Sequence, residues 1–290
     1  MPGLQVRKVL ITGADGQLGH ELVRATIAAG HEVIATSHET LDITDKTAVD
    51  AVITETRPDV VIHAAAWTAV DACESEPEKA LLVNGTATKY IADAAHAVGA
   101  HVVYISTDYV LDGSKTSAYD ESDATNPQSV YGSSKLAGER ALGATDAIVR
   151  ISWVCGFYGA NMVKTILRLA EQPQLKFVDD QIGNPTFADD AAEMIVRLAI
   201  EKRPGTWHVT NQGEVSWYQF AREVLIAGGF DADKVVPIKT HELQPPRPAT
   251  RPFNSVLNNA SLKNAGIALL PDFREPLARL VSQIQRNERG

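Results

Sequence analysis

The stretch Gly13-Ala-Asp-Gly16-Gln-Leu-Gly19 decides the fold of this 290-residue chain. It follows a short apolar run at residues 8–12 and opens a helical pattern at residues 18–29. Glycines three apart allow a tight turn and a close approach of the backbone to a bound group, and the N-terminus of the following helix favours an anion. The stretch predicts a dinucleotide pyrophosphate site at Gly13, Gly16 and Gly19. The alternative is a glycine-rich turn without a ligand.

Apolar, β-branched runs alternate with helical patterns over the first part of the chain. The runs lie at residues 8–12, 32–36, 60–65, 101–106 and 147–151, and the helical patterns at 18–29, 79–98 and 130–142. Nearly continuous apolar character is typical of strands buried on both faces of a parallel sheet. We therefore expect an α/β fold, a Rossmann-like doubly wound parallel sheet with a smaller C-terminal substrate-binding domain.

The alternation of apolar runs and helical patterns becomes less regular after Ser152, which suggests a domain boundary. We expect residues 1–155 to form an NAD(P)-binding Rossmann domain, to which a segment at about 185–210 returns. Residues 156–290 then form mainly the substrate-binding domain, with helices at 161–170, 189–200 and 217–227 and a strand at 207–210. The proline-rich residues 243–252 are expected to be extended.

Tyr131-Gly-Ser-Ser-Lys135 supplies acid/base chemistry for a carbonyl group. A Tyr and a Lys four residues apart share one helix face, and a nearby ammonium can lower the pKa of a phenol. Thr107 ends an earlier strand at the carboxyl edge of the sheet, where such folds bind ligands. We expect Tyr131 to donate a proton to a carbonyl oxygen, Lys135 to tune that phenol, and Thr107 to donate a hydrogen bond to the same oxygen. The alternative is a structural Tyr–Lys pair.

The end of the second strand predicts the choice of cofactor. A carboxylate there would bind the 2′-hydroxyl of NAD, but the chain has Thr36, Ser37 and His38, with Glu39 slightly beyond. A 2′-phosphate is not repelled, so NADPH is weakly favoured and NADH stays open. Asp42, in the next loop, either reaches the adenosine half or caps a helix.

Composition excludes several classes of function. The formal net charge of −9 argues against nucleic acid as a partner. No signal peptide and no apolar stretch of about 18 residues is evident, so a cytoplasmic location without membrane contact is expected. Cys73 and Cys155 are read as buried hydrophobes, and the eight histidines show no metal-ligand arrangement, so no metal is predicted.

The motifs of the chain extend from the predicted cofactor domain into the residues that follow it. As they stand, the motifs of the chain include Gly16-Gln17-Leu18-Gly19, Ala64-Ala65-Ala66-Trp67-Thr68, Ser106-Thr107-Asp108-Tyr109-Val110, Val130-Tyr131-Gly-Ser-Ser-Lys135, Arg150-Ile-Ser-Trp153, Asp180-Gln181-Ile-Gly183-Asn-Pro185 and Arg251-Pro-Phe-Asn-Ser255. Together they resemble the extended short-chain dehydrogenase/reductase superfamily and, within it, the dTDP-4-dehydrorhamnose reductase family. Two positions depart from the family pattern, because Trp67 replaces a Tyr or His and Leu111 replaces an aromatic residue.

The resemblance implies a reaction and the residues that serve it. The expected reaction is NAD(P)H-dependent reduction of the C4 keto group of dTDP-4-dehydro-L-rhamnose to dTDP-L-rhamnose, for polysaccharide biosynthesis. The expected catalytic residues are Thr107, Tyr131 and Lys135, and the expected substrate-binding residues are Thr107, Asp108, Trp153 and Arg251. The expected cofactor-binding residues are Gly13, Gly16, Gln17, Leu18, Gly19, Ser37, Asp42, Ile43, Ala64, Ala65, Ala66, Trp67, Thr68, Ile105, Tyr131 and Lys135.

The resemblance leaves the assembly open. Some family members are described as dimers bridged by magnesium through glutamates. Glu21 matches one of these positions and the others are not found, so a homodimer stays open.

Three alternatives remain beside this interpretation. A 4,6-dehydratase would need a Glu directly after Asp108, and the chain has Tyr109, so dehydration is disfavoured. Another nucleotide-sugar 4-ketoreductase or an epimerase would use the same Thr, Tyr and Lys. A non-catalytic regulatory subunit of the methionine adenosyltransferase type would tolerate loss of Tyr131 or Lys135, and both are present.

Overall fold

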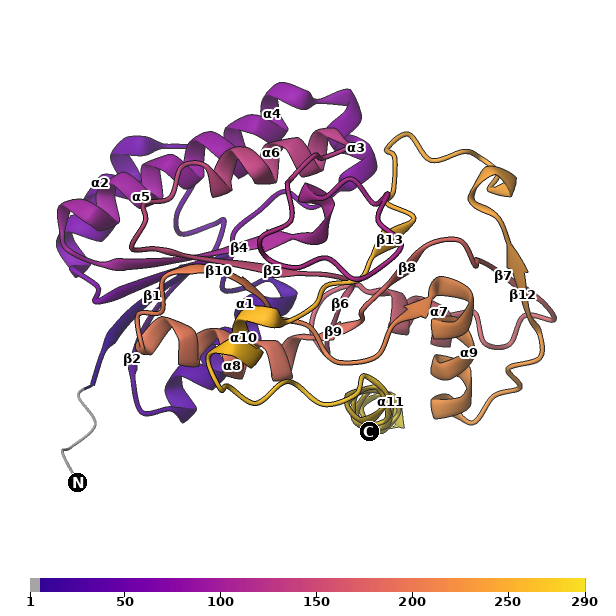
Figure 1. Cartoon of the computed structure of the whole chain (residues 1–290). Coiled ribbons are helices and arrows are strands. Elements are labelled where there is room, and N and C mark those ends of the chain that lie inside the picture. Colours follow the sequence, from indigo (N-terminus) through magenta and orange to yellow (C-terminus); the bar gives the residue numbers. More distant parts are fainter. Residues whose placement is uncertain (1–5, 290) are drawn as a thin grey trace.

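Six parallel strands form the central sheet of the computed structural model, which describes residues 6–289 (Figure 1). Their order is β10-β5-β4-β3-β1-β2. The strands are β1 (Lys8–Thr12), β2 (Glu32–Thr36), β3 (Val60–His63), β4 (His101–Thr107), β5 (Ala147–Ile151) and β10 (Gly205–His208). The predicted fold class, a doubly wound parallel sheet, is confirmed.

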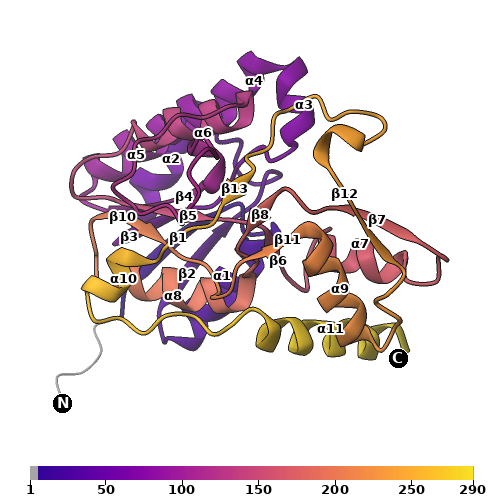
Figure 2. The same ribbon diagram turned by 45° about the vertical axis from the view of Figure 1, so that its right-hand side comes forward.

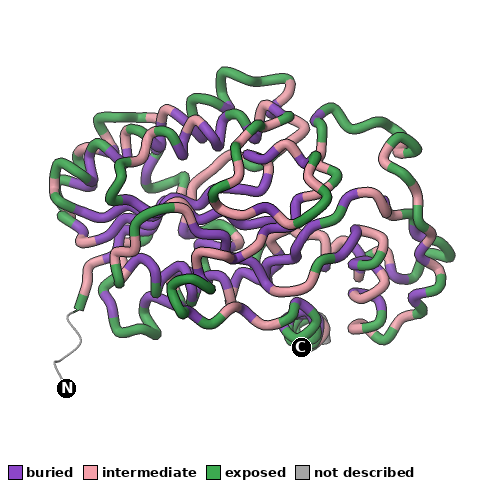
Figure 3. Tube along the Cα trace, viewed as in Figure 1, coloured by how far each residue is buried: buried purple, intermediate pink, exposed green. Residues whose placement is uncertain are grey.

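Helices cover both faces of this sheet (Figure 1). One face packs against α1 (Gln17–Ala28) and α8 (Ala188–Ile200), and the other against α2 (Lys46–Thr56) and α5 (Ala87–Ala97). The catalytic-motif helix α6 (Val130–Glu139) lies beside α5, above β4. The strands run through the buried centre of the molecule (Figure 3). Their carboxyl ends therefore meet at one edge, where loops can hold a ligand.

A smaller group of elements lies beyond that edge (Figure 2). Its helices are α7 (Met162–Arg168), α9 (Trp217–Gly228) and α11 (Arg274–Arg289), which share a second hydrophobic core. Its strands form small sheets: β7 (Leu175–Val178) with β12 (Val235–Ile238), β8 (Ile182–Gly183) with β11 (Val215–Ser216) and β13 (Asn254–Ser255), and β6 (Val154–Cys155) with β9 (Thr186–Phe187). That this group is the substrate-binding domain stays a prediction.

Several expected elements have other bounds in the structure; for example, the helix expected at 130–142 ends at Glu139 and the strand expected at 60–65 ends at His63. The helix expected at residues 79–98 is three consecutive pieces: α4 (Pro77–Leu81), a π-helical turn (Leu82–Thr86) and α5. The strand expected at 207–210 is β10, two residues earlier. Before α4 lies α3 (Val70–Ser75), and α10 (Ala260–Asn264) packs on β10. Among the described residues, no helix is long and apolar enough to span a membrane.

Candidate active site

Two adjoining cavities lie at the carboxyl ends of β1, β3 and β4. One, of about 410 Å³, has Ser37, Asp42, Ile43, Ala65 and Trp67 among its lining residues. The other, of about 390 Å³, is lined by Gln17, Leu18, Gly19, Thr68, Ile105, Thr107, Asp108, Tyr131, Lys135 and Trp153, among others. Gly13, Gly16, Ala64 and Ala66 line both. The structure thus brings all the predicted cofactor residues together, and Arg251 is not among the lining residues of either cavity.

The glycine turn has the geometry of a phosphate cradle. Gly13 has φ +70°, and a Cβ at Gly19 would lie 2.0 Å from the Gly13 carbonyl oxygen. Helix α1 begins directly after Gly16, which makes no side-chain capping bond. The first N–H groups of α1 are therefore available to an anion, and the turn fits a dinucleotide pyrophosphate.

The loop after β2 is organised by its own side chains. The Asp42 carboxylate accepts hydrogen bonds from the backbone N–H and the hydroxyl of Thr44, at 2.9 and 2.7 Å, and these bonds lower its pKa. The N-cap of α2 is Asp45. Asp42 is thus not a helix cap, and its exposed carboxylate shapes the wall beside Ser37.

Tyr131 and Lys135 lie side by side in the first turns of α6, which Ser129 caps at 3.1 Å from the Gly132 nitrogen. The Lys135 ammonium is 2% exposed and donates to the Ile105 carbonyl oxygen at 2.7 Å. Burial lowers its pKa to about 7, and the charge of Glu139 acts in the opposite direction. Burial raises the pKa of Tyr131 and the charge of Asp108 raises it further, so the tuning of this phenol by Lys135 stays a prediction.

Asp108 and Thr107 form a buried pair at the end of β4. The Thr107 hydroxyl donates to Asp108 Oδ1 at 2.9 Å and accepts the backbone N–H of Tyr109 at 3.2 Å. Asp108 is 2% exposed, and burial raises its pKa to about 6. The ring of Tyr109 meets Tyr131 edge-on, with centroids 5.5 Å apart. A carboxyl, a hydroxyl and a phenol are therefore grouped in one wall of the cavity.

Trp153 also lines this cavity and is held in an uncommon backbone conformation. Its φ is +46°, and its indole stacks on Trp217 of α9 with centroids 3.6 Å apart and planes at 9°. A Cβ at Gly183 would come within 2.8 Å of that indole. The contacts from Gly183 and Trp217 fix the ring where the smaller group of elements meets the sheet edge.

Arg251 contacts a protein carboxylate. Its guanidinium binds Asp71 at the N-terminus of α3, and Arg247 lies 3.4 Å from the same carboxylate. The hydrogen bonds from Arg251 are the main reason that the pKa of Asp71 falls to about 2. The predicted substrate-binding role of Arg251 therefore requires exchange of Asp71 for substrate.

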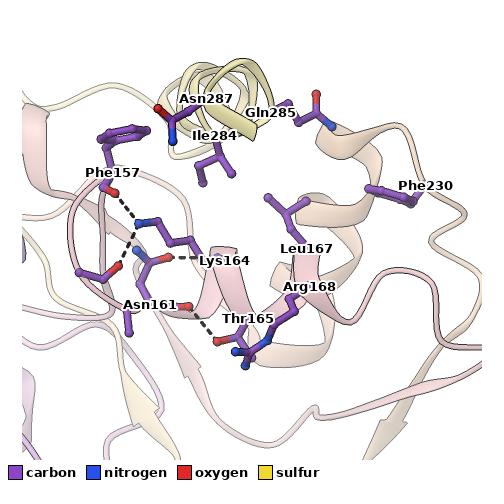
Figure 4. A pocket seen from close by; sticks show the side chains of 12 residues that line it. Phe157, Asn161, Lys164, Thr165, Leu167, Arg168, Phe230, Ile284, Gln285 and Asn287 are labelled. Carbon is purple, nitrogen blue, oxygen red and sulfur yellow. Dashed lines mark hydrogen bonds between the residues drawn. The ribbon is translucent and has the colours of Figure 1, made fainter. Parts of the chain in front are cut away.

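A larger cavity, of about 830 Å³, lies outside this cluster between α7 and α11 (Figure 4). The Lys164 ammonium beside it is bound by the carbonyl oxygens of Phe157 and Gly159. Asn161 links this region to the site by donating to Gln17 Oε1 at 2.8 Å. No predicted site residue lines the larger cavity, so the two cavities at the sheet edge remain the candidate active site.

Comparison with known proteins decides the family. The family model described as RmlD substrate binding domain matches residues 7–286. A dTDP-4-dehydrorhamnose reductase from Streptomyces griseus is 42% identical over 278 residues, covering 92% of this chain and 91% of the relative. The chain belongs to the dTDP-4-dehydrorhamnose reductase family. The Bacillus subtilis spore coat polysaccharide biosynthesis protein SpsK is also 42% identical, over 90% of this chain and 92% of its own. The crystal structure of the Bacillus anthracis reductase in complex with NADP has a TM-score of 0.92 and 37% identity, covering 96% of this chain and 100% of that one.

This reductase-family chain also uses residues that the sequence reasoning missed. Asn84, on the π-helical turn, accepts the Trp67 backbone N–H at 2.8 Å and donates to the Trp67 carbonyl and the Ser134 hydroxyl, both at 3.0 Å. It thereby ties the cofactor loop to α6. The sequence Asn84-Gly85 within an expected helix was the available signal, since both residues disfavour helix interiors.

A buried ion pair in this reductase-family chain joins α6 to β5. Glu139 accepts two hydrogen bonds from Arg150, at 2.9 and 2.7 Å, and one from the Ser106 hydroxyl at 2.6 Å. Both charged side chains are 5% exposed. Nothing in the linear sequence indicated this pairing, because Glu139 and Arg150 lie on different elements, α6 and β5.

The two departures from the family pattern lie in different places. Trp67 lines the cavity of about 410 Å³, with the Lys79 ammonium 4.3 Å from its ring centre. Leu111 is buried with Val110, Tyr119, Leu136 and Leu257, outside both site cavities. Glu21 is buried and pairs with Arg24 at 2.6 Å, and the described residues contain no group of three metal-ligating side chains.

Proposed function

We propose that this protein reduces the C4 keto group of dTDP-4-dehydro-L-rhamnose with NADPH and releases dTDP-L-rhamnose. The observation that supports this most is the grouping of Thr107, Tyr131 and Lys135 beside the glycine turn, in a chain of the dTDP-4-dehydrorhamnose reductase family. The acid/base residues of a carbonyl reductase and a dinucleotide cradle thus face the same cavity.

NADPH is the proposed cofactor, and when bound it supplies the hydride that reduces the carbonyl carbon. The turn at Gly13, Gly16 and Gly19 would hold its pyrophosphate. The residues that end β2, Thr36 to His38, carry no carboxylate to bind the 2′-hydroxyl of NAD, and the Asp42 carboxylate in the same cavity wall is bound by Thr44. A relative of TM-score 0.92 was crystallised with NADP. Lys135, buried beside Ile105, would hold the nicotinamide ribose.

The residues of the chain then handle the carbonyl oxygen. Tyr131 donates its phenolic proton to that oxygen as negative charge develops on it, and Thr107 donates a hydrogen bond to the same atom. Trp153 packs against the sugar and limits how the carbonyl is presented. Asp108 contacts the sugar from the Thr107 side, and Arg251 binds the nucleotide phosphates after leaving Asp71. The homodimer and the cytoplasmic location stay predictions.

The test is incubation of the purified protein with NADPH and dTDP-4-dehydro-L-rhamnose. We expect the nicotinamide absorbance to fall in step with the appearance of dTDP-L-rhamnose. Absence of oxidation of either NADPH or NADH would reject the reductase. Conversion of the sugar without net use of nicotinamide would indicate an epimerase instead.

A further inference from the structure

One oxygen of the Asp108 carboxyl group has no hydrogen-bond partner. Oδ1 accepts the Thr107 hydroxyl, whereas Oδ2 is fully buried and unpaired within the described part of the chain. A buried, unpaired carboxylate oxygen costs free energy, and a carboxyl group in such a place binds a proton more readily than in water. The site therefore keeps Asp108 in the carboxylic acid form to a higher pH than water does, up to about pH 6.

The single proton of the Thr107 hydroxyl makes this protonation state important. While Asp108 is ionised, Thr107 donates to Oδ1, as the 2.9 Å distance indicates. That proton cannot at the same time be donated to a substrate oxygen or to Tyr131. If Asp108 is a carboxylic acid, it can donate to Thr107, and the Thr107 proton becomes free for the cavity. The expected role of Thr107 thus requires Asp108 to be protonated.

The charged and titratable groups around Asp108 agree with this state. Tyr131 of α6 and Tyr109 of the same loop both face it, and the charge of Asp108 raises the pKa of each phenol. The charge of Arg251 lowers the pKa of Tyr109, and the charge of Asp71 raises it. The Thr107 and Ser255 hydroxyls and the backbone of Asp108 and Tyr109 are neutral groups that lower the pKa of Asp108, and burial raises it by more than they lower it. An ionised Asp108 would therefore oppose the phenolate that Tyr131 becomes when it donates its proton.

We propose that Asp108 is the proton source that restores Tyr131 during turnover, acting through the Thr107 hydroxyl. This rests on the proposed function. When Tyr131 gives its proton to the substrate oxygen, its O–H bond breaks and the phenolate takes the Thr107 proton. Thr107 takes the carboxyl proton of Asp108, which becomes a carboxylate. Each turnover consumes one proton, and Asp108 recovers it from water once the product has left.

The first test is the pH profile of Asp108→Asn. Reduction by the wild type should slow as pH rises through the Asp108 pKa, because the acid form is the working one. Asp108→Asn should lower kcat about 10²-fold, within the usual range for a lost proton donor, and should change KM less. The rate of this variant should no longer fall as pH rises through the Asp108 pKa. Asp112→Asn is the matched control, since this nearby carboxyl accepts the Tyr119 hydroxyl at 2.6 Å and should keep the wild-type profile. An unchanged profile in Asp108→Asn would overturn the proposal.

The second test does not require activity. The infrared spectrum of the wild type should contain a carboxylic acid C=O band below pH 6 that weakens above it. The band should be absent in Asp108→Asn and present in Tyr131→Phe. If no such band belongs to Asp108, the proton source is rejected even if the reductase is confirmed. If the band is found but no ketone is reduced, the proposed function is rejected, whereas the protonated state of Asp108 is confirmed.

Discussion

The guanidinium of Arg251 binds both oxygens of the Asp71 carboxylate, with Nη1–Oδ1 and Nη2–Oδ2 distances of 2.5 and 2.8 Å. The pair joins the segment that contains Arg251 to the start of α3. Asp71 thereby engages a guanidinium whose geometry is also suited to phosphate. We predict that Arg251→Ala raises the KM for the dTDP-sugar about 10- to 100-fold, as for the loss of charge-assisted hydrogen bonds. Asp71→Asn should leave that KM unchanged or lower it. Equal increases in KM for the two variants would mean that the pair is only a structural tether.

Tyr131→Phe tests the proton donor itself. The change removes one hydroxyl from an almost fully buried ring, so the packing of α6 should persist. We predict that kcat falls by about 10²–10⁴-fold, while the Kd for NADPH, measured by fluorescence titration, stays near the wild-type value. Activity near that of the wild type would show that another group supplies the proton.

Glu139→Gln should destabilise the protein strongly. It leaves the Arg150 guanidinium buried without its countercharge, and breaking a buried pair in this way costs about 3–5 kcal/mol. Asp93→Asn is the control, because the Lys89–Asp93 pair on α5 is exposed and such pairs contribute about 0.3–0.5 kcal/mol. Urea unfolding of the three proteins measures the difference. Similar midpoints for the two variants would contradict the assignment of a buried ion pair.

Asp108→Asn also has a predictable effect on stability. The folded protein holds the Asp108 proton up to about pH 6, whereas an unfolded chain releases it near 3.8. Proton binding therefore favours folding, and this contribution is present below 3.8 and lost as pH rises through 6. One pKa unit corresponds to about 1.4 kcal/mol, so the unfolding free energy of the wild type should fall by about 1–3 kcal/mol relative to Asp108→Asn across this window. A parallel pH dependence in the two proteins would be the contrary result.

Gly19→Ala tests the phosphate cradle. The new Cβ would meet backbone atoms of Gly13 and Ala14, which have no flexible end that can move aside. Distorting the turn should weaken NADPH binding by about 10-fold or more, in line with overpacking costs of 1–3 kcal/mol. Calorimetric titration measures this. Gly143→Ala, whose Cβ would meet only the Asp146 side chain at 3.3 Å and a His96 ring, should bind NADPH normally.

The sequence was sufficient to predict those elements whose signals lie in a few neighbouring residues. The β-branched runs placed β1, β2 and β5 at their observed bounds, and the glycine spacing located the turn that opens α1. The residues expected to bind the cofactor all line the two cavities, because consecutive strands of a parallel sheet bring their carboxyl ends together.

The rest depended on contacts between distant residues. Asn84 lies on the π-helical turn that interrupts an expected helix, and its side chain bonds the backbone of Trp67, which is distant in sequence. The Tyr131 pKa could not be inferred from the Tyr-x-x-x-Lys spacing, since burial dominates it. The pairing of Asp71 with Arg251 could not be predicted from the sequence either, because only the tertiary fold brings the two residues together.

The position of β10 has a consequence for synthesis of the protein. The chain leaves the central sheet after β5 and returns only at Gly205, where it pairs with Ala147. A nascent or truncated chain that ends soon after Ile151 would contain Thr107, Tyr131 and Lys135 but would expose the whole edge of β5. An unpaired strand edge recruits other strands. Premature stop codons before β10 should therefore yield aggregates and no smaller working enzyme.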